Sequence, residues 1–382
     1  MPTSRTSFQK YLDSGWDDLL VWLPHDLDKI AAEVGSFQRR RAIRSVADLV
    51  RMALAYSVND LSLRSTAAWA AERGIAKMSD VAVLGRLRAA GPLLERLLVA
   101  LLARQVRPVL GTLKGWSIKL VDATALSGPG STETDWRVHA SFNPASGCID
   151  AIELTDKHGG EHLARFPAKP GDVLVADRGY AHEARLAEVV AGGAHFVVRI
   201  GHSAVPLQDE EGKPVDPLRF ATRKRPRAGR PPRVEARVVH LRCDKDRKNP
   251  LRLVVVRKTE DAAERERARA EQAARKKGRR VSQRTLSSAK FTYLLTTLSD
   301  EDLPAVEVAE LYRLRWQVEL AFKRWKSLLG LDNLRAEDPA LAKTYIYGKL
   351  IAAVLADAIT RQWRAFSPYG APLSDRSVAG LA

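Results

Sequence analysis

Four residues with chemically active side chains recur along one stretch of the sequence: Tyr312, Arg315, Glu319 and Lys326. Their spacing places them on one face of an α-helix, because such a helix has 3.6 residues per turn. The stretch 312–326 contains no Gly or Pro and predicts a continuous helix. A carboxylate flanked by an aromatic hydroxyl and two cations could hold a metal ion beside a phosphate. A solvated helix face with ordinary ion pairs would show the same spacing, so this stretch alone leaves both interpretations open.

Two aspartates, Asp122 and Asp177, each follow an apolar run that predicts a buried β-strand. An acid at the carboxyl end of such a strand lies at the rim of the sheet, where α/β proteins bind ligands. Adjacent strands would bring the two acids together, and Glu319 could complete a cluster of three carboxylates. The alternatives are a helix cap for Asp122 and a turn for Asp177, which precedes Gly179.

Such a carboxylate cluster suits Mg²⁺ or Mn²⁺, which are hard cations that prefer oxygen ligands. Two of these ions about 4 Å apart stabilise the attacking and leaving oxygens in phosphodiester displacement. Three close carboxylates without a cation would repel one another. The sequence therefore predicts a site for two divalent ions if the three acids meet.

The composition favours a polyanionic partner. The chain has 382 residues and a formal net charge of +17, from 62 Lys and Arg against 45 Asp and Glu. A strongly basic balance points first to nucleic acid. No run approaches the roughly 20 apolar residues of a membrane helix, and the first residues lack a signal-peptide core, so we expect a cytoplasmic protein without membrane contact. Two cysteines are too few for a disulfide framework or a thiolate zinc site.

The first part of the chain, residues 1–110, predicts short helices. Ser45 and Ser79 have the types and surroundings of helix-capping residues. The pair Gly91-Pro92 predicts an interruption of the helix that follows Ser79. Several short helices with arginines favour a domain that binds DNA ends, although a plain helical packing domain would look alike.

Residues 111–200 change to a two-residue period, which is typical of β-strands. A helix is expected between the last two of five strands, so the segment predicts a mixed α/β sheet. The predicted strands are 116–122, 136–142, 148–155, 173–177 and 195–200.

A basic segment then interrupts this pattern. It contains two strand-like runs at 234–243 and 251–256, and a cluster of cations around Arg223, Lys224, Arg225 and Arg227. Residues 262–284 predict either a solvated helix or a disordered linker. The expected division of the chain is a helical domain at 1–110, a core at 111–200 and 291–335, a basic β-rich insertion at 201–290 and a C-terminal helical segment at 336–382.

Taken together, these features resemble the DDE transposases of the IS-four family. The signature of that family, Tyr-x2-Arg-x3-Glu-x6-Lys, is matched in full by Tyr312, Arg315, Glu319 and Lys326. The two family aspartates are matched by Asp122 in Val-Asp-Ala-Thr and by Asp177 in Ala-Asp-Arg-Gly-Tyr. The resemblance covers roughly residues 37–365 and implies a ribonuclease-H-like mixed α/β core, with a β-rich insertion before the last acid.

The resemblance also implies roles for these residues. Asp122, Asp177 and Glu319 would be the catalytic residues and the ligands of Mg²⁺ or Mn²⁺, with two ions bound. The DNA phosphates would be held by Tyr312, Arg315 and Lys326. Arg178, beside Asp177, could reach a phosphate or pair with an acid. In some relatives a tryptophan of the insertion receives a flipped base; residues 201–290 contain no Trp, and Phe291 or Tyr293 could take its place.

The activity implied is metal-dependent cleavage at the ends of an insertion element, followed by strand transfer into target DNA. Activated water attacks first, and the freed 3′ hydroxyl then attacks the target strand, with two copies of the protein on double-stranded DNA. Two alternatives stay open. The short segment after the last helix would suit a DNA-binding remnant that inhibits transposition, and the core alone would suit a ribonuclease-H-like nuclease without strand joining.

Overall fold

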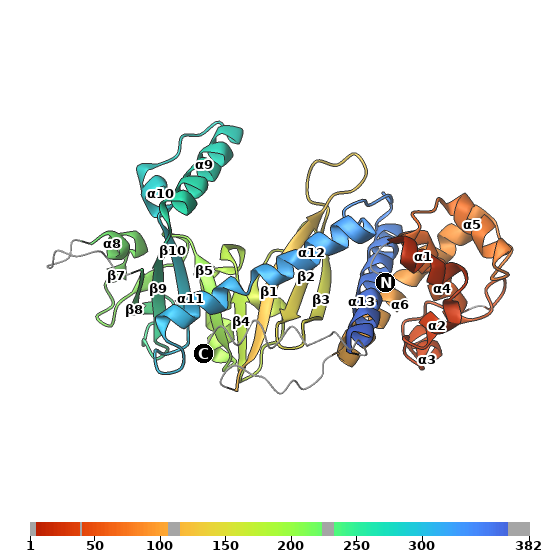
Figure 1. The fold of residues 1–382 in the computed structure, drawn as a ribbon, viewed down its shortest axis with the longest axis horizontal. Coiled ribbons are helices and arrows are strands. Elements are labelled where there is room, and N and C mark those ends of the chain that lie inside the picture. Colours follow the sequence, from red (N-terminus) through yellow and green to blue (C-terminus); the bar gives the residue numbers. More distant parts are fainter. Residues whose placement is uncertain (1–4, 39, 106–114, 224–232, 366–382) are drawn as a thin grey trace.

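The structure is a computed structural model that describes residues 5–38, 40–105, 115–223 and 233–365. A bundle of helices lies at one end of the molecule, and a long mixed sheet extends from it (Figure 1). Within the described ranges, no helix combines the length and the apolar character needed to cross a membrane.

The N-terminal region is helical, as predicted. The Ser45 hydroxyl accepts a hydrogen bond from the backbone N–H of Asp48, which caps the helix that follows. The helices of this region are α1 (Arg5–Asp13), α2 (Trp16–Leu20), α3 (Leu27–Glu33), α4 (Val46–Val58), α5 (Leu63–Glu72) and α6 (Asp80–Gln105).

Helix α6 corrects one prediction, because it continues through Gly91 and Pro92 without a break. Proline removes one backbone hydrogen bond from a helix interior, so contacts elsewhere must hold such a helix together. Here the helix packs against α13 (Pro339–Ala365), and the buried Thr344 hydroxyl donates a 2.6 Å hydrogen bond to the Leu87 carbonyl. Tertiary packing therefore holds together a helix that local sequence alone predicts to be interrupted.

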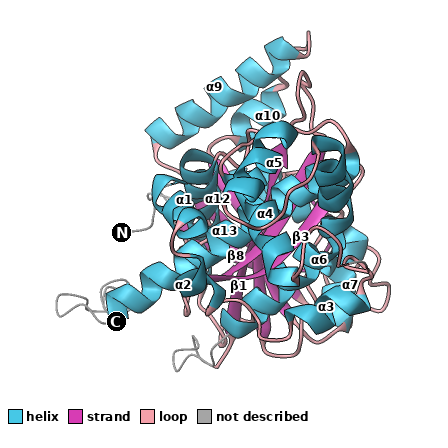
Figure 2. Ribbon diagram, turned by 90° about the vertical axis from the view of Figure 1, so that its right-hand side faces the viewer, coloured by secondary structure: helices cyan, strands magenta, loops and turns pink. Residues whose placement is uncertain are grey.

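The C-terminal helix α13 belongs to the same bundle as the N-terminal helices. It packs against α4 and α6, and its apolar residues share one continuous core with theirs. In Figure 2, which faces this end of the molecule, α4, α5 and α13 lie in front of the strands. The helical segments from the two ends of the chain thus form one packing unit.

The sheet confirms the predicted α/β class and its ribonuclease-H-like mixed core. Strand β1 pairs antiparallel with β2, which pairs antiparallel with β3, while β1, β4 and β5 run parallel. The order along the sheet is β3-β2-β1-β4-β5-β10-β9-β8-β6-β7. The core strands are β1 (Ser117–Leu126), β2 (Trp136–Asn143), β3 (Cys148–Asp156), β4 (Asp172–Ala176), β5 (His195–Ile200) and β10 (Phe291–Thr296).

Strand β4 is buried on both faces, which explains its uninterrupted apolar sequence. Val173 and Val175 face the core shared with the helical bundle. Leu174 and Ala176 face a second core, which includes residues of α7 (Glu183–Ala191) on the other side of the sheet. A strand fixed from both sides holds the residue that follows it, Asp177, in a defined position.

The segment between β5 and β10 extends the sheet beyond the core, because β10 pairs with both β5 and β9. Residues 262–284 form mostly helix rather than a disordered linker, with acids in the first turn of α9 and bases in its last turn, which suits the helix dipole. Arg223 directly follows α8, while Lys224, Arg225 and Arg227 lie outside the described residues. The elements are β6 (Leu207–Gln208), β7 (Pro214–Val215), α8 (Pro217–Thr222), β8 (Val234–Leu241), β9 (Leu251–Arg257), α9 (Glu260–Lys276) and α10 (Gln283–Ser288).

Two consecutive helices, α11 (Ala305–Arg313) and α12 (Trp316–Leu329), cross the sheet diagonally (Figure 1). Helix α11 packs on β4, β5, β8 and β9, and α12 packs on β1 and β2. Their junction therefore lies over the middle of the core sheet, above the strands that carry the predicted aspartates.

Candidate functional site

The register of the sheet places Asp122 and Asp177 side by side. The parallel pairing of β1 with β4 ends at Val121, which lies opposite Ala176. Asp122 directly follows Val121, and Asp177 directly follows Ala176. One prediction needs correction: Asp122 does not end its strand, because β1 continues to Leu126 in antiparallel pairing with β2. It therefore caps no helix, and it lies where β1 loses its parallel neighbour.

The helix predicted over 312–326 is divided into two, which corrects a second expectation. Backbone N–H groups of Leu314 and Arg315 bond to carbonyls three residues back, Leu311 and Tyr312, each at 3.1 Å. This is the tighter winding of a 3₁₀ turn, in which side chains three apart are in line. The turn stacks Arg315 against Tyr312, with its guanidinium carbon 5.8 Å from the ring centroid. Tyr312 thus lies in the last turn of α11, and Glu319 lies in the first turn of α12.

The side chains at this junction contact the aspartates directly. The Tyr312 hydroxyl donates a hydrogen bond to Oδ1 of Asp177 at 3.0 Å. The Arg315 guanidinium donates to Oδ2 of Asp122 at 3.3 Å and, through its other Nη, to Oε1 of Glu319. Arg315 is 12% exposed, so these ion pairs are shielded from water. Three elements, β1, β4 and the α11–α12 junction, therefore bring all three predicted acids to one place.

The two remaining predicted phosphate-binding residues lie at the margin of this cluster. The Lys326 ammonium donates to the carbonyl of Ala125 at 3.3 Å, three residues beyond Asp122 on β1. The Arg178 side chain is exposed, next to Asp177. Both cations face solvent near the acids, where a phosphate could reach them.

Arg199, which was not among the residues predicted from the sequence, also contacts the site. Its Nη1 lies 3.8 Å from Oδ1 of Asp177, and its Nη2 lies 3.2 Å from Oε1 of Glu266 on α9. The available signal was a single charged residue inside the apolar strand Phe196-Val-Val-Arg-Ile. A charge in such a buried strand usually has a specific partner.

The structure also corrects the expectation for a flipped base. Phe291 and Tyr293 are buried side chains of β10, exposed by 5% and 3%. Their rings pack in the core beneath the sheet. Neither presents a face on which a nucleotide base could stack.

The electrostatics of the two aspartates differ. Burial raises the pKa of Asp122 to about 6, against the opposing effect of Arg315, and the nearby Glu319 and Asp177 add to the rise. Burial also acts on Asp177, but the Arg178 backbone N–H, Arg199, Arg315 and Tyr312 outweigh it and hold its pKa below the usual value. Burial and Asp177 raise the pKa of Tyr312 to about 12, so its hydroxyl stays protonated and donates. Burial therefore opposes the charged form of Asp122 more effectively than that of Asp177.

The donors at this site fit a divalent cation of the Mg²⁺ type, since all are carboxylate oxygens. As the side chains stand, no three His, Cys, Asp or Glu of the described residues are grouped closely enough to hold a metal. The Arg315 guanidinium pairs with both Asp122 and Glu319 and so lies between these two acids. A cation bound by these acids would require Arg315 to move aside.

Comparison with known proteins identifies the family of this chain. The transposase DDE domain family matches residues 115–355. A piggyBac transposase, solved in a synaptic complex with hairpin DNA, aligns with 93% of this chain and 74% of its own, at a TM-score of 0.45 and 11% identity. The putative transposase InsL of insertion sequence element IS186A from Escherichia coli K12 is 36% identical over 380 residues, 94% of this chain and 98% of that protein. The transposase of insertion sequence element IS421 from Escherichia coli is 36% identical over 381 residues, with the same coverage. By its family match and these two relatives, this chain belongs to the DDE transposases.

Proposed function

We propose that this transposase cuts DNA at the ends of its insertion element and joins those ends to target DNA, as a member of the IS-four group. The observation that carries the proposal is the convergence of Asp122, Asp177 and Glu319 around the Tyr312–Arg315 turn. In this proposal the four residues of the Tyr-x2-Arg-x3-Glu-x6-Lys signature act together with the two aspartates.

The three acids would hold Mg²⁺ or Mn²⁺, and two ions are proposed. When bound, such ions stabilise the attacking and leaving oxygens of a phosphodiester displacement. Asp177 is ionised and held in place by Tyr312, so it is prepared to act as a ligand. Arg315 lies between Asp122 and Glu319 in the structure described, and on DNA binding its guanidinium would turn to the phosphate.

The other signature residues would position the DNA strand. Lys326 and Arg178 face solvent beside the acids and would each contact a backbone phosphate. Positioned cations of this kind stabilise charge that develops on a transferring phosphoryl group. The N-terminal helical region, residues 1–110, would bind the element ends, and two copies would assemble on double-stranded DNA in the cytoplasm.

The test is single-turnover cleavage of duplex DNA that carries the two ends of the element encoding this protein. Changing Asp122, Asp177 or Glu319 to Ala should abolish nicking in Mg²⁺ and leave binding of end DNA largely intact, since metal ligands act in the chemical step. The matched control is Glu307→Ala, an exposed acid in the first turn of α11, which should cleave normally. Nicking by the Asp177→Ala variant at a rate close to that of the unchanged protein would refute the assigned site.

The same reaction separates transposition from simple hydrolysis. Addition of a supercoiled target plasmid should give joined strands in which a 3′ end of the element is linked to a 5′ phosphate of the target, so that each joined strand begins in the element and continues 3′ into target DNA. Cleavage without joined products would assign a ribonuclease-H-like nuclease instead. Binding of end DNA without any cleavage would assign an inhibitory DNA-binding protein.

A further inference from the structure

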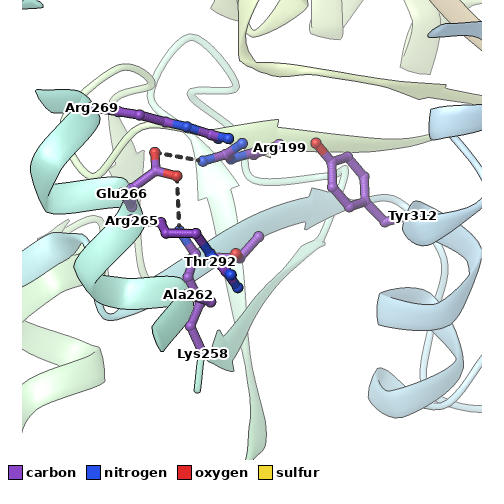
Figure 3. Close-up of a pocket in the computed structure, with 8 residues that line it drawn as sticks. All are labelled: Arg199, Lys258, Ala262, Arg265, Glu266, Arg269, Thr292 and Tyr312. Atoms are coloured by element: carbon purple, nitrogen blue, oxygen red, sulfur yellow. Dashed lines mark hydrogen bonds and ion pairs between the residues drawn. The ribbon is translucent and has the colours of Figure 1, made fainter. Parts of the chain in front are cut away.

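A cavity of about 220 Å³ lies beside the candidate site, between helix α9 and the core sheet. Figure 3 shows the side chains that line it, which come from β5, the segment between β9 and α9, α9 itself, β10 and the last turn of α11. The lining residues are Arg199, Lys258, Ala262, Arg265, Glu266, Arg269, Thr292 and Tyr312. The cavity therefore joins the basic insertion to the catalytic core.

The charge of this lining is strongly positive. It contains four cations, Arg199, Lys258, Arg265 and Arg269, and a single acid, Glu266. The Glu266 carboxylate lies 3.2 Å from Nη2 of Arg199 and 3.4 Å from Nζ of Lys258. Among the residues that the structure describes, Arg265 and Arg269 form no ion pair, so two cations of the lining lack an anion.

The ion pairs of Glu266 also provide much of the contact between α9 and the sheet. Ala263 is the only residue of α9 that is buried, so apolar packing contributes little to holding the helix on the sheet. The carboxylate of Glu266 instead connects α9 to Arg199 on β5 and to Lys258 after β9. Burial raises the pKa of Glu266, but Lys258 and Arg199 outweigh burial and hold it below its usual value, so the group is ionised.

Two side chains connect the cavity to the catalytic acids. Arg199 binds Glu266 with one Nη and lies 3.8 Å from Oδ1 of Asp177 with the other. Tyr312 lines the cavity while its hydroxyl donates to the same Asp177 oxygen. An anion in the cavity would thus be one side chain away from the acids that surround the scissile phosphate.

We propose that this cavity binds one backbone phosphate of the DNA strand next to the scissile phosphate, and that the Glu266 carboxylate holds the place of that phosphate in the DNA-free protein. The inference rests on the proposed function, because it assigns a position on the same DNA strand. A phosphodiester is favoured over a base: the lining offers guanidinium and ammonium donors, and its one ring, Tyr312, is stacked with Arg315. The resulting contact would bring α9 of the insertion onto the DNA.

The first test removes the two unpaired cations. Binding of end DNA is measured without divalent metal at several salt concentrations, for the unchanged protein and for the Arg265→Gln/Arg269→Gln variant. The slope of log K against log salt should become shallower by about 0.9, the value for one phosphate contact. The control is Arg275→Gln/Lys276→Gln, which removes the same charge from the last turn of α9, away from the cavity. Equal changes of slope in the two variants would mean that α9 acts only through diffuse charge, and would overturn the proposal.

A second test locates the phosphate. End duplexes carry a single neutral methylphosphonate at successive positions around the cleavage site. One position should weaken binding by the unchanged protein about threefold to tenfold and leave binding by the Arg265→Gln/Arg269→Gln variant unaffected, which is the signature of a direct contact. If every position weakens the two proteins equally, the cavity holds no phosphate.

The third measurement concerns Glu266. If the carboxylate occupies the position of a phosphate, Glu266→Gln should bind end DNA at least as tightly as the unchanged protein, since one repulsive charge is lost. If Glu266 serves only to attach α9, the variant should bind more weakly and lose helix stability, and the place-holding role is wrong. Failure of the unchanged protein to bind or cut end DNA would instead contradict the proposed function itself.

Discussion

Nη1 of Arg315 lies 3.3 Å from Oδ2 of Asp122, although the two residues are 193 positions apart in the chain. The same guanidinium binds Glu319. Arg315 therefore supplies positive charge at the point where two acids converge and where a divalent cation would bind. In the DNA-free protein it prevents the repulsion that three neighbouring carboxylates would otherwise suffer.

This arrangement predicts competition between Arg315 and the metal. The variant Arg315→Gln should bind Mn²⁺ at least tenfold more tightly in the absence of DNA, because a unit charge about 4 Å from the ion contributes several kcal/mol at an effective dielectric of ~20. Isothermal titration calorimetry measures the affinity. Arg313→Gln, which removes an exposed cation paired with Glu310, is the control and should leave it unchanged. Unchanged or weaker Mn²⁺ binding by the Arg315 variant would show that the guanidinium does not occupy the metal position.

Lys326 provides a test of strand positioning without a stability effect. Its bond to the Ala125 carbonyl is exposed, so Lys326→Gln should change the free energy of unfolding by less than about 1 kcal/mol. If Lys326 holds a phosphate, the variant should cut pre-bound end DNA about tenfold to a hundredfold more slowly, since small misplacement of reacting groups is costly. Single-turnover cleavage and thermal unfolding are the two measurements. Arg324→Gln, an exposed cation on another face of α12, should have neither effect.

Local patterns in the sequence were sufficient to predict the core strands and to make the convergence of the acids one of the open interpretations. The apolar run before Asp177 predicts β4 because a strand buried on both faces has no polar alternation. Register then follows from parallel pairing, which places Asp122 beside Asp177. These features depend on residues that are close together in the chain or that lie on neighbouring strands of one sheet. The periodicity of apolar residues in the sequence indicates both.

Other features could not be predicted because they depend on contacts between distant residues. Residues 314 and 315 keep right-handed helical backbone angles, so the 3.6-residue period does not reveal the tight turn between α11 and α12. Pro92 stays inside α6 because of packing against α13, some 250 residues later. The pairing of Arg199 with Glu266 requires knowing where α9 lies on the sheet.

A buried ion pair connects the helical bundle to the end of α12. Lys349 on α13 is fully buried, 3.1 Å from Oδ1 of Asp60, and also donates to the carbonyl of Gly330 at 2.6 Å. Lys349→Met should lower the free energy of unfolding by about 3–5 kcal/mol, because Asp60 is left buried without its cation. Urea unfolding measures this. Lys349→Met/Asp60→Asn should recover much of the loss, since no buried charge remains, and a double variant as unstable as the single one would contradict this account.

The last prediction concerns acid stability and His139 on β2. This side chain is fully buried, its Nε2 lies 3.0 Å from the Thr155 hydroxyl, and its Nδ1 has no partner among the described residues. Burial, helped by Arg165, Arg137 and His162, lowers the pKa of His139 from 6.5 to about 3. The unfolded chain therefore takes up a proton at this residue at a higher pH than the folded protein does.

The sign follows from this difference. Between about pH 6.5 and pH 3 the unfolded state binds more protons at His139, so folding stability falls as the pH falls, by up to about 1.4 kcal/mol per pH unit. In His139→Gln this contribution is absent, and the free energy of unfolding should decline less steeply between pH 6 and pH 4 than in the unchanged protein. Urea titrations at each pH give the two slopes. His25→Gln, which removes an exposed histidine, should retain the original slope. If His139→Gln retains it as well, His139 is protonated in the folded protein and its burial does not oppose the charge.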